Sequence, residues 1–425
     1  MRPFHTRLFL AAAVTLSAAP LAAQADSLAL LARARRLHAQ YPLVDGHNDL
    51  PWEIREKGFS DLGRMDPNGP LPNNHTDVAR LKAGGVGGVF WAAYVPVETI
   101  GHQPGPARVA LEQIDLVHRM VRQSPDLEMA LTAADVERIH HNHRIAALIG
   151  IEGGHAIENS LGALRQFYDL GVRYMTLTHT STIDWADAAT DRETHGGLTR
   201  FGEEVVREMN RLGMLVDLSH VSPGTMSDAI RVSAAPVIFS HSSARALADH
   251  PRNVPDSILV RLKENGGIVM VNFYSGFTEP GAVALARASY GVADSIRALY
   301  PSDAAARERA MDEWRRANPM PRGTIHTIAD HIDHIVKVGG IEHVGYGSDF
   351  DGVTSLPVGL DDVSRFPYLT AELLRRGYSD ADVAKILGGN LLRVMHQAEA
   401  VAQRLQGERG PSTAQIDQLD GGLVR

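Results

Sequence analysis

Short apolar segments alternate with longer stretches of helical periodicity between about residue 40 and residue 400. A chain that alternates strands with helices is typical of a parallel sheet covered by helices. Eight strands in this order predict an α/β fold, a (β/α)8 TIM-like barrel. The eight apolar segments are YPLVDGH, GGVGGVFWAAYV, IAALIGIEGG, VRYMTLTH, GMLVDLSH, APVIFSHS, GGIVMVNFY and EHVGYGSDF.

One interval between these segments is much longer than the others. Between the seventh and eighth strands lies the stretch PGAVALARASYGVADSIRALYPSDAAARERAMDEWRRANP, whose periodicity and charge predict a helical insertion over the mouth of the barrel. No linker rich in Pro, Ser or Gly divides the chain, so we expect a single domain over residues 26–400. Residues 401–425 are polar and rich in glycine, which predicts a mobile C-terminal tail.

Residues 1–25 have the features of a signal peptide. Arg2 and Arg7 supply positive charge, the apolar run LFLAAAVTLSAAPLAA follows, and Ala23-Gln24-Ala25 matches a cleavage site. We therefore expect an exported protein, periplasmic or secreted, whose mature chain begins at Asp26. No later segment approaches the roughly twenty apolar residues that a bilayer requires, so no stable membrane anchor is expected.

The amino-acid composition restricts the metal ligands and the binding partners that the protein can have. The sequence contains no cysteine, so any metal ion must be bound by nitrogen and oxygen ligands, and the fold must rest on its core. The formal net charge is −8, and removal of the two leader arginines makes it more negative still. This acidic balance argues against a general nucleic-acid-binding protein.

Barrel enzymes place their chemistry at the C-terminal ends of the strands. Six of the eight apolar segments end in a residue that can bind a metal ion or move a proton, whereas the second does not and the seventh ends in Tyr274. Histidines that come before strands or on helical patterns are expected at the surface, namely His140, His141, His143, His326, His331 and His334. The strand-end residues are His47 with Asp49, then Glu152, His179, His220, His241 and Asp349.

These strand-end residues predict a binuclear metal site. His47 and Asp49 lie two residues apart, so in a strand both would project from one face and hold one divalent ion. His220 and His241 would hold a second ion, and Glu152 would place one oxygen on each. Sites with three protein ligands and open positions suit catalytic zinc, and two such ions clamp a bridging water and polarise a carbonyl oxygen. The chemistry indicated is hydrolysis.

A bridging carbamylated lysine, which some binuclear barrel hydrolases use, does not fit. All five lysines, which are Lys57, Lys82, Lys263, Lys337 and Lys385, lie away from the predicted strand ends. A glutamate is therefore the remaining candidate for the ligand that bridges the two metal ions.

Nine segments of the chain resemble blocks of the membrane (renal or microsomal) dipeptidase family, in the order in which that family has them. They span residues 45–395 and therefore nearly all of the expected mature chain. The segments are DGHNDLPW, IEGGHAIE, MTLTHTSTIDWAD, LVDLSHVS, IFSHSSAR, HPRNVPD, VNFYSGF, GYGSDFDGV and ILGGNLLRV.

This resemblance implies a zinc-dependent dipeptidase on an amidohydrolase-like barrel, with two Zn²⁺ ions per chain and dipeptides as substrates. It implies that His179 stabilises the oxyanion and that Asp349 moves a proton from water to the leaving amine and meets the substrate ammonium. Arg252, with Tyr274 nearby, would bind the dipeptide carboxylate. A planar guanidinium matches a carboxylate, which supports that role independently.

Other interpretations of the sequence stay open. A related amidohydrolase could act on another amide, a lactam or an ester, and a non-catalytic metal or peptide binder could keep the barrel. Animal family members carry disulfides and a C-terminal lipid anchor, which a chain without cysteine or a hydrophobic tail does not support. We also consider a homodimer, for which the sequence gives no signal of its own.

Overall fold

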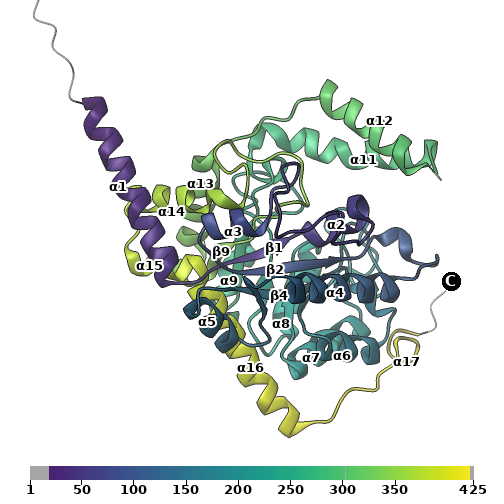
Figure 1. Ribbon diagram of the computed structural model, residues 1–425. Coiled ribbons are helices and arrows are strands. Elements are labelled where there is room, and N and C mark those ends of the chain that lie inside the picture. Colours follow the sequence, from purple (N-terminus) through teal and green to yellow (C-terminus); the bar gives the residue numbers. More distant parts are fainter. Residues whose placement is uncertain (1–18, 302, 422–425) are drawn as a thin grey trace, which may run out of the picture.

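In the computed structural model, eight parallel strands close into a barrel, which confirms the predicted (β/α)8 fold (Figure 1). The structure describes residues 19–301 and 303–421. β1 pairs with both β2 and β9, and β2 pairs with β4, so the ring of eight strands is closed. The barrel strands are β1 (Leu43–Asn48), β2 (Val86–Tyr94), β4 (Ile145–Glu152), β5 (Val172–Thr176), β6 (Leu215–Asp217), β7 (Ile238–Phe239), β8 (Ile268–Val271) and β9 (Val344–Tyr346).

A ninth strand was not predicted. β3 (Leu127–Met129) pairs with Ile145–Ala147 at the start of β4. β5 pairs with β4 only from Ile149 onward, and β2 takes the opposite edge of β4 over nearly its whole length. β3 therefore extends the sheet at the N-terminal end of the barrel without interrupting the closed ring.

Helices cover the outside of the barrel and return the chain from one strand to the next. Capping boxes at Thr132 and Ser379 fix the starts of α5 and α15. α7 shows the pattern of a covering helix, because Phe201, Val205 and Met209 recur on one buried face. The helices are α1 (Ala19–Gln40), α2 (Leu50–Gly58), α3 (Val78–Ala83), α4 (Pro106–Gln123), α5 (Ala133–His141), α6 (Leu161–Asp169), α7 (Arg200–Leu212), α8 (Pro223–Val232), α9 (Asp256–Asn265), α13 (Ile325–Val338), α14 (Phe366–Arg375), α15 (Asp380–Ala384), α16 (Asn390–Glu408) and α17 (Ile416–Asp420).

The interior of the barrel is packed by side chains that alternate with those facing the helices. Val44, Phe90, Leu148 and Tyr174 belong to the same buried cluster, whereas their chain neighbours pack in the larger cluster under the helices. Gly150 lies opposite Tyr174 inside the barrel, and a Cβ at that position would come within 2.0 Å of the Tyr174 ring. The missing side chain leaves the space that the tyrosine fills.

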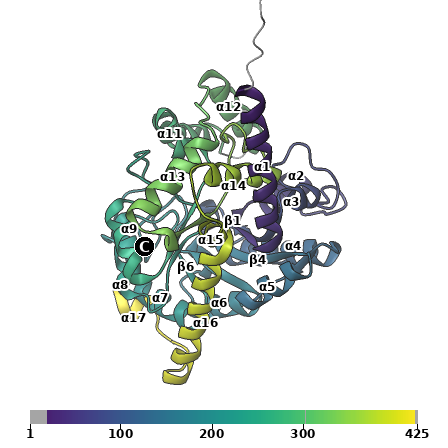
Figure 2. The ribbon, with the colours of Figure 1, turned by 90° about the vertical axis from the view of Figure 1, so that its left-hand side faces the viewer.

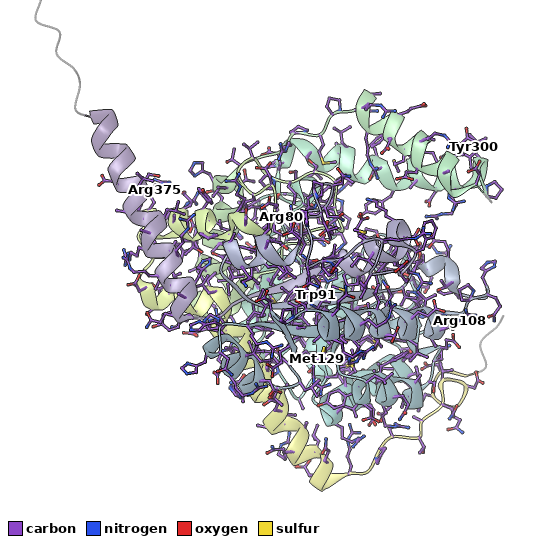
Figure 3. The ribbon with its side chains drawn as sticks, in the orientation of Figure 1. Arg80, Trp91, Arg108, Met129, Tyr300 and Arg375 are labelled. Atoms are coloured by element: carbon purple, nitrogen blue, oxygen red, sulfur yellow. The ribbon has the colours of Figure 1, made fainter. Side chains whose placement is uncertain are left out.

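The long interval between β8 and β9 is helical, as predicted. It contains α10 (Ser275–Thr278), α11 (Val283–Leu299) and α12 (Ala304–Ala317). α11 and α12 form a pair that projects from the body of the molecule (Figures 1 and 2). Figure 3 labels Trp91, on the barrel strand β2, and Tyr300, at the outer end of this pair.

The N-terminal helix α1 packs against α14 along one side of the body (Figure 2). The predicted signal peptide begins in residues 1–18, which lie outside the described residues, so that prediction remains untested. Among residues 19–301 and 303–421, no helix combines the length and the apolar character needed to cross a membrane.

The prediction of a mobile tail after residue 400 is wrong for the described residues up to 421. α16 continues to Glu408, and the chain then docks on α7. Glu208 of α7 accepts from the Ser412 amide (3.3 Å), and Asp420 accepts from the Arg200 amide (3.0 Å) at the start of α7. A carboxylate at a helix N-terminus is favourable, so polar contacts act together with the burial of Ile416 to hold this segment.

The fit of Gly150 against Tyr174 gives a test of the interior packing. We expect Gly150→Ala to lower the free energy of unfolding by about 1–3 kcal/mol, because the new methyl group displaces a fully buried ring. Urea unfolding followed by circular dichroism measures the change.

The matched control is Gly291→Ala on α11, where a Cβ meets nothing within 4 Å. Alanine there should leave stability unchanged or raise it by about 0.5–1 kcal/mol, because glycine weakens helix interiors. Equal stability of Gly150→Ala and the parent would contradict the described packing.

Candidate metal centre and active site

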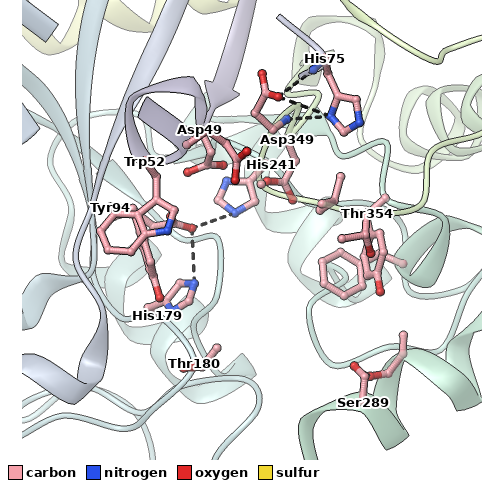
Figure 4. Close-up of a pocket in the computed structure, with 18 of the residues that line it drawn as sticks. Asp49, Trp52, His75, Tyr94, His179, Thr180, His241, Ser289, Asp349 and Thr354 are labelled. Atoms are coloured by element: carbon pink, nitrogen blue, oxygen red, sulfur yellow. Dashed lines mark hydrogen bonds and ion pairs between the residues drawn. The ribbon is translucent and has the colours of Figure 1, made fainter. Parts of the chain in front are cut away.

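The residues predicted for the active site lie together at the C-terminal end of the barrel (Figure 4). Each comes from the end of a strand or from the loop that follows it. His47 is on β1 and Asp49 follows it, Glu152 ends β4, and His179, His220, His241 and Asp349 follow β5, β6, β7 and β9; Tyr274 caps α10 after β8, and Arg252 lies between β7 and α9.

Glu152 is the centre of this group. Its Oε1 lies 3.0 Å from His220 Nε2 and 3.4 Å from His241 Nε2. Its Oε2 faces the other way, 3.6 Å from His47 Nε2, which in turn lies 3.2 Å from Asp49 Oδ2. The two carboxylate oxygens therefore point at two different sets of ligands, which is the arrangement a glutamate needs to bridge two cations.

Hydrogen bonds orient two of the imidazoles with Nε2 toward Glu152. His47 Nδ1 lies 2.8 Å from the hydroxyl of Tyr174, which has the carbonyl of Gly46 as its own acceptor. His241 Nδ1 lies 2.8 Å from Ser240 Oγ, which donates to Asp217. When each Nδ1 carries the proton, each Nε2 keeps its lone pair for a metal ion.

The electrostatics of the cluster also suit a cation. Burial lowers the pKa of both His220 and His241, so both are neutral donors, and their Nε2 atoms lie only 2.9 Å apart. Burial opposes ionisation of Glu152, but the imidazoles of His47 and His179 hold its pKa well below the usual range. Neutral nitrogens converging on a carboxylate form a donor set for a divalent metal ion.

Asp349, in the loop after β9, is a further carboxyl group of this site. Burial, with a smaller contribution from the nearby Asp49, raises the pKa of Asp349 to about 8 against the opposing influence of His47. Asn272 Nδ2 donates to Asp349 Oδ2 at 2.7 Å and fixes the carboxyl. A carboxyl held in this way can carry a proton near neutral pH.

Backbone strain coincides with the site. His220 has φ of 71° and Asp349 has φ of 65°, in the left-handed region that few non-glycine residues adopt. Such residues persist where the surroundings hold them in place, and they concentrate at functional sites. The strain aims both side chains toward the cluster.

Arg252 is a buried cation without an anionic partner. Its side chain is 1% exposed, and it forms no ion pair with the residues that the structure describes. Its hydrogen bonds to Ser242 and to the His241 carbonyl are long, at 3.4 and 3.3 Å, and its Nε has no partner. The guanidinium packs 5.2 Å from the centre of the Phe277 ring and lines the same cavity as Glu152. It is therefore available to an anion in that cavity.

The cavity has a volume of about 720 Å³, within the range of small-molecule sites. His179 enters it with its Nε2 3.7 Å from Glu152 Oε1 and its ring against Tyr94. Trp52 packs on the other side of Tyr94 and extends this aromatic wall (Figure 4).

Several residues of the site were not predicted: Tyr94 and Tyr290, which line the cavity, and Asn272, which donates to Asp349. Tyr94 ends β2 and could have been found by the same strand-end rule, had tyrosine been weighed there as it was for Tyr274. Asn272 lies one residue past β8. Tyr290 reaches the cavity from α11, and no sequence signal in the insertion marked it.

Most histidines set aside from the site lie at or near the surface, but His331 does not. It is 1% exposed, and its Nδ1 accepts from the Ala244 amide while its Nε2 donates to the Thr278 carbonyl. It joins the loop after β7 to α10. The prediction of a surface position was wrong because the apolar face of α13 includes this histidine.

Comparison with known proteins identifies relatives over most of the chain. A family model described as membrane dipeptidase (peptidase family M19) matches residues 31–409. Dipeptidase verJ of Clonostachys rogersoniana is 42% identical over 386 residues, which cover 88% of this chain and 89% of that protein. Dipeptidase 3 of Homo sapiens is 40% identical over 387 residues, which cover 90% of this chain and 70% of that protein.

Solved structures share the fold. The probable dipeptidase PvdM from Pseudomonas aeruginosa matches with a TM-score of 0.74 and 26% identity, covering 88% of this chain and 99% of that chain. A metallo peptidase from Rhodobacter sphaeroides, liganded with a phosphinate mimic of the dipeptide L-Ala-D-Ala, matches with a TM-score of 0.67 and 26% identity, covering 84% and 99%.

The hydrogen bond from His47 to Tyr174 gives a test of the metal site. We expect Tyr174→Phe to weaken binding of Zn²⁺ by about 10–100-fold, because the partner that orients a ligand is lost. Titration of metal-free protein against a chromophoric chelator measures the affinity.

Tyr346→Phe is the matched control. Tyr346 is also fully buried on a barrel strand, but its hydroxyl is near only Thr370, at 3.5 Å. Its variant should bind Zn²⁺ as the parent does. Identical affinity of the two variants would mean that Tyr174 does not orient a ligand.

Proposed function

Because the chain belongs to the membrane dipeptidase family, peptidase family M19, we propose that it is a binuclear zinc dipeptidase acting on dipeptides with free amino and carboxyl termini. The single observation that carries the substrate assignment is Arg252, a buried guanidinium without a carboxylate partner in the cavity of the predicted ligands. A dipeptide is a small zwitterion, and this cavity offers it a cation and carboxylates.

His47 and Asp49 would hold one zinc ion, His220 and His241 the other, and Glu152 would bridge them. The opposed directions of the two Glu152 oxygens support this division. All five donors are nitrogen or oxygen atoms, and each ion would keep open positions, as catalytic zinc requires. When bound, the ions would activate water and polarise the substrate carbonyl.

The residues of the chain would place the dipeptide and move its protons. Arg252 would bind the C-terminal carboxylate through its planar fork, with Tyr274 at the same wall. His179, which faces the cavity beside Glu152, would donate to the oxygen on which charge develops. The phosphinate dipeptide mimic bound by the Rhodobacter sphaeroides relative supports a site of this kind for a dipeptide.

Asp349 would act as the proton carrier. Its raised pKa supports uptake of a proton from the attacking water and its return to the leaving amine. The bond from Asn272 keeps one carboxyl oxygen fixed while the other faces the cavity. In its ionised form, Asp349 would also meet the substrate ammonium.

We also propose that the protein is exported, to the periplasm or the medium. The support is the sequence of residues 1–25, with two arginines, an apolar run and a small-residue cleavage pattern.

The proposed activity predicts metal-dependent release of free amino acids. Purified protein with Zn²⁺ should hydrolyse members of a panel of L-L and L-D dipeptides, and chelation should lower the rate about 100-fold or more. Amino-acid analysis follows the products, and elemental analysis should find two zinc ions per chain. A metal-loaded protein that leaves every dipeptide intact would contradict the proposal.

The role of Arg252 predicts a selective loss of substrate affinity. Arg252→Gln should raise KM by at least ~30-fold, equivalent to about 2 kcal/mol, for dipeptides with a free carboxylate. C-terminally amidated dipeptides, which lack that charge, should be hydrolysed alike by variant and parent.

Arg261→Gln is the control, because Arg261 on α9 donates to Ser227 of α8 and does not line the cavity. It should leave KM unchanged. An equal loss for free and amidated substrates would favour a related amidohydrolase acting on another amide, a lactam or an ester.

A further inference from the structure

A second chamber adjoins the catalytic cavity. It has a volume of about 510 Å³ and shares part of its wall with the first, so the two lie side by side. The shared residues are His75, Tyr274, Ser289, Met311, Arg315 and Thr354. No part of the chemistry proposed above uses this space.

The helical insertion builds much of the chamber. Met311, Trp314 and Asn318 come from α12 and its end, and Met320 and Arg322 from the segment that follows. The opposite wall is the loop after β9, where Leu356 is 5% exposed.

Hydrogen bonds hold these walls in place. The Ser275 amide donates to the Ser355 carbonyl (2.9 Å), and the Ser275 hydroxyl donates to the Arg322 carbonyl (2.6 Å). Arg322 in turn donates to the Leu356 carbonyl at 2.7 Å. The chamber is therefore a formed space rather than a gap between loose segments.

The chemistry of the chamber suits an apolar ligand. Its two arginines are already paired, Arg322 with Asp361 at 2.6 Å and Arg315 with Asp312 at 3.0 Å. The apolar part of the walls is an indole, two thioethers and an aliphatic side chain, from Trp314, Met311, Met320 and Leu356. The other uncharged wall residues are His75, Tyr274, Ser289, Asn318, Thr354 and Ser355. Aromatic and methionine side chains adapt well to large apolar groups.

The chamber lies on the side of the site where the substrate carboxylate is expected. Arg252 packs on Phe277, and Phe277 makes an edge contact of 4.8 Å with Tyr274, which lines both spaces. Figure 4 shows Ser289 and Thr354 across the cavity from Trp52 and Tyr94. A dipeptide anchored by Arg252 would thus have its C-terminal residue beside the opening.

We propose that this chamber binds the side chain of the C-terminal residue of the dipeptide and makes the protein prefer large apolar side chains there. The proposal rests on the proposed dipeptidase function. It assigns the helical insertion a role in substrate selection, with Trp314 as the residue that determines the preference.

The test compares three dipeptides by kcat/KM: alanyl-phenylalanine, alanyl-alanine and the reversed phenylalanyl-alanine. The parent should prefer alanyl-phenylalanine to each of the others by about 10-fold or more, the discrimination typical of an apolar pocket. Trp314→Ala should reduce the ratio of alanyl-phenylalanine to alanyl-alanine by about 10-fold. Arg316→Ala, on the exposed part of the same helix, should keep the parental ratio.

A second variant closes the opening. Ser289→Phe places a ring at the shared wall and should raise KM for alanyl-phenylalanine more than for alanyl-alanine. A parental ratio in both variants, or a preference for phenylalanyl-alanine, would overturn the proposal. Those results differ from a failure of the proposed function, in which none of the three dipeptides would be hydrolysed.

Discussion

The interaction on which the site depends is that of one buried carboxylate with imidazole nitrogens on opposite sides. Glu152 is surrounded by His47, His220 and His241, and burial keeps the last two neutral. Nitrogen lone pairs and a carboxylate converging in a low dielectric repel one another unless a metal ion or a proton lies among them, and the raised pKa of His47 shows this attraction for positive charge. The same arrangement that would cost stability without a cation therefore provides strong binding with one, and it couples the function of this end of the barrel to a metal ion.

The closed barrel is what brings these side chains together. Ligands from β1, β4 and the loops after β6 and β7 are far apart in sequence, yet the hydrogen-bonded ring of strands brings their ends to one rim. Inside the ring, Gly150 leaves space for Tyr174, and Tyr174 reaches the back of His47. Tyr174 therefore takes part both in the packing of the barrel interior and in the orientation of His47. A substitution in the interior that displaces Tyr174 is expected to disturb the site above it.

The fold and the convergence of the site residues could be predicted because both depend on repeated local signals. Strands with apolar runs and polar ends indicate a barrel and its catalytic rim together. β3 carried too little signal, with three residues of which only Leu127 is fully buried. The position of His331 and the docking of Ser412 and Asp420 could not be predicted, since each depends on a partner distant in sequence. The roles of the site residues remain predictions from chemistry and family, and the structure shows that the side chains lie together at one end of the barrel.

The insertion between β8 and β9 obeys a different constraint from the barrel. The rim residues are fixed by strand geometry, so substitutions there alter the chemistry itself. α11 buries little of its own surface, with only Ala286 fully buried among its described residues, and its sequence is correspondingly free to vary. Because Tyr290 and Ser289 of α11 and Met311 of α12 nevertheless line the cavity, changes in the insertion can reshape the space around a substrate without moving the ligands of the metal site. If the insertion selects the substrate as proposed, this separation lets the selecting residues change while the metal-site residues are kept.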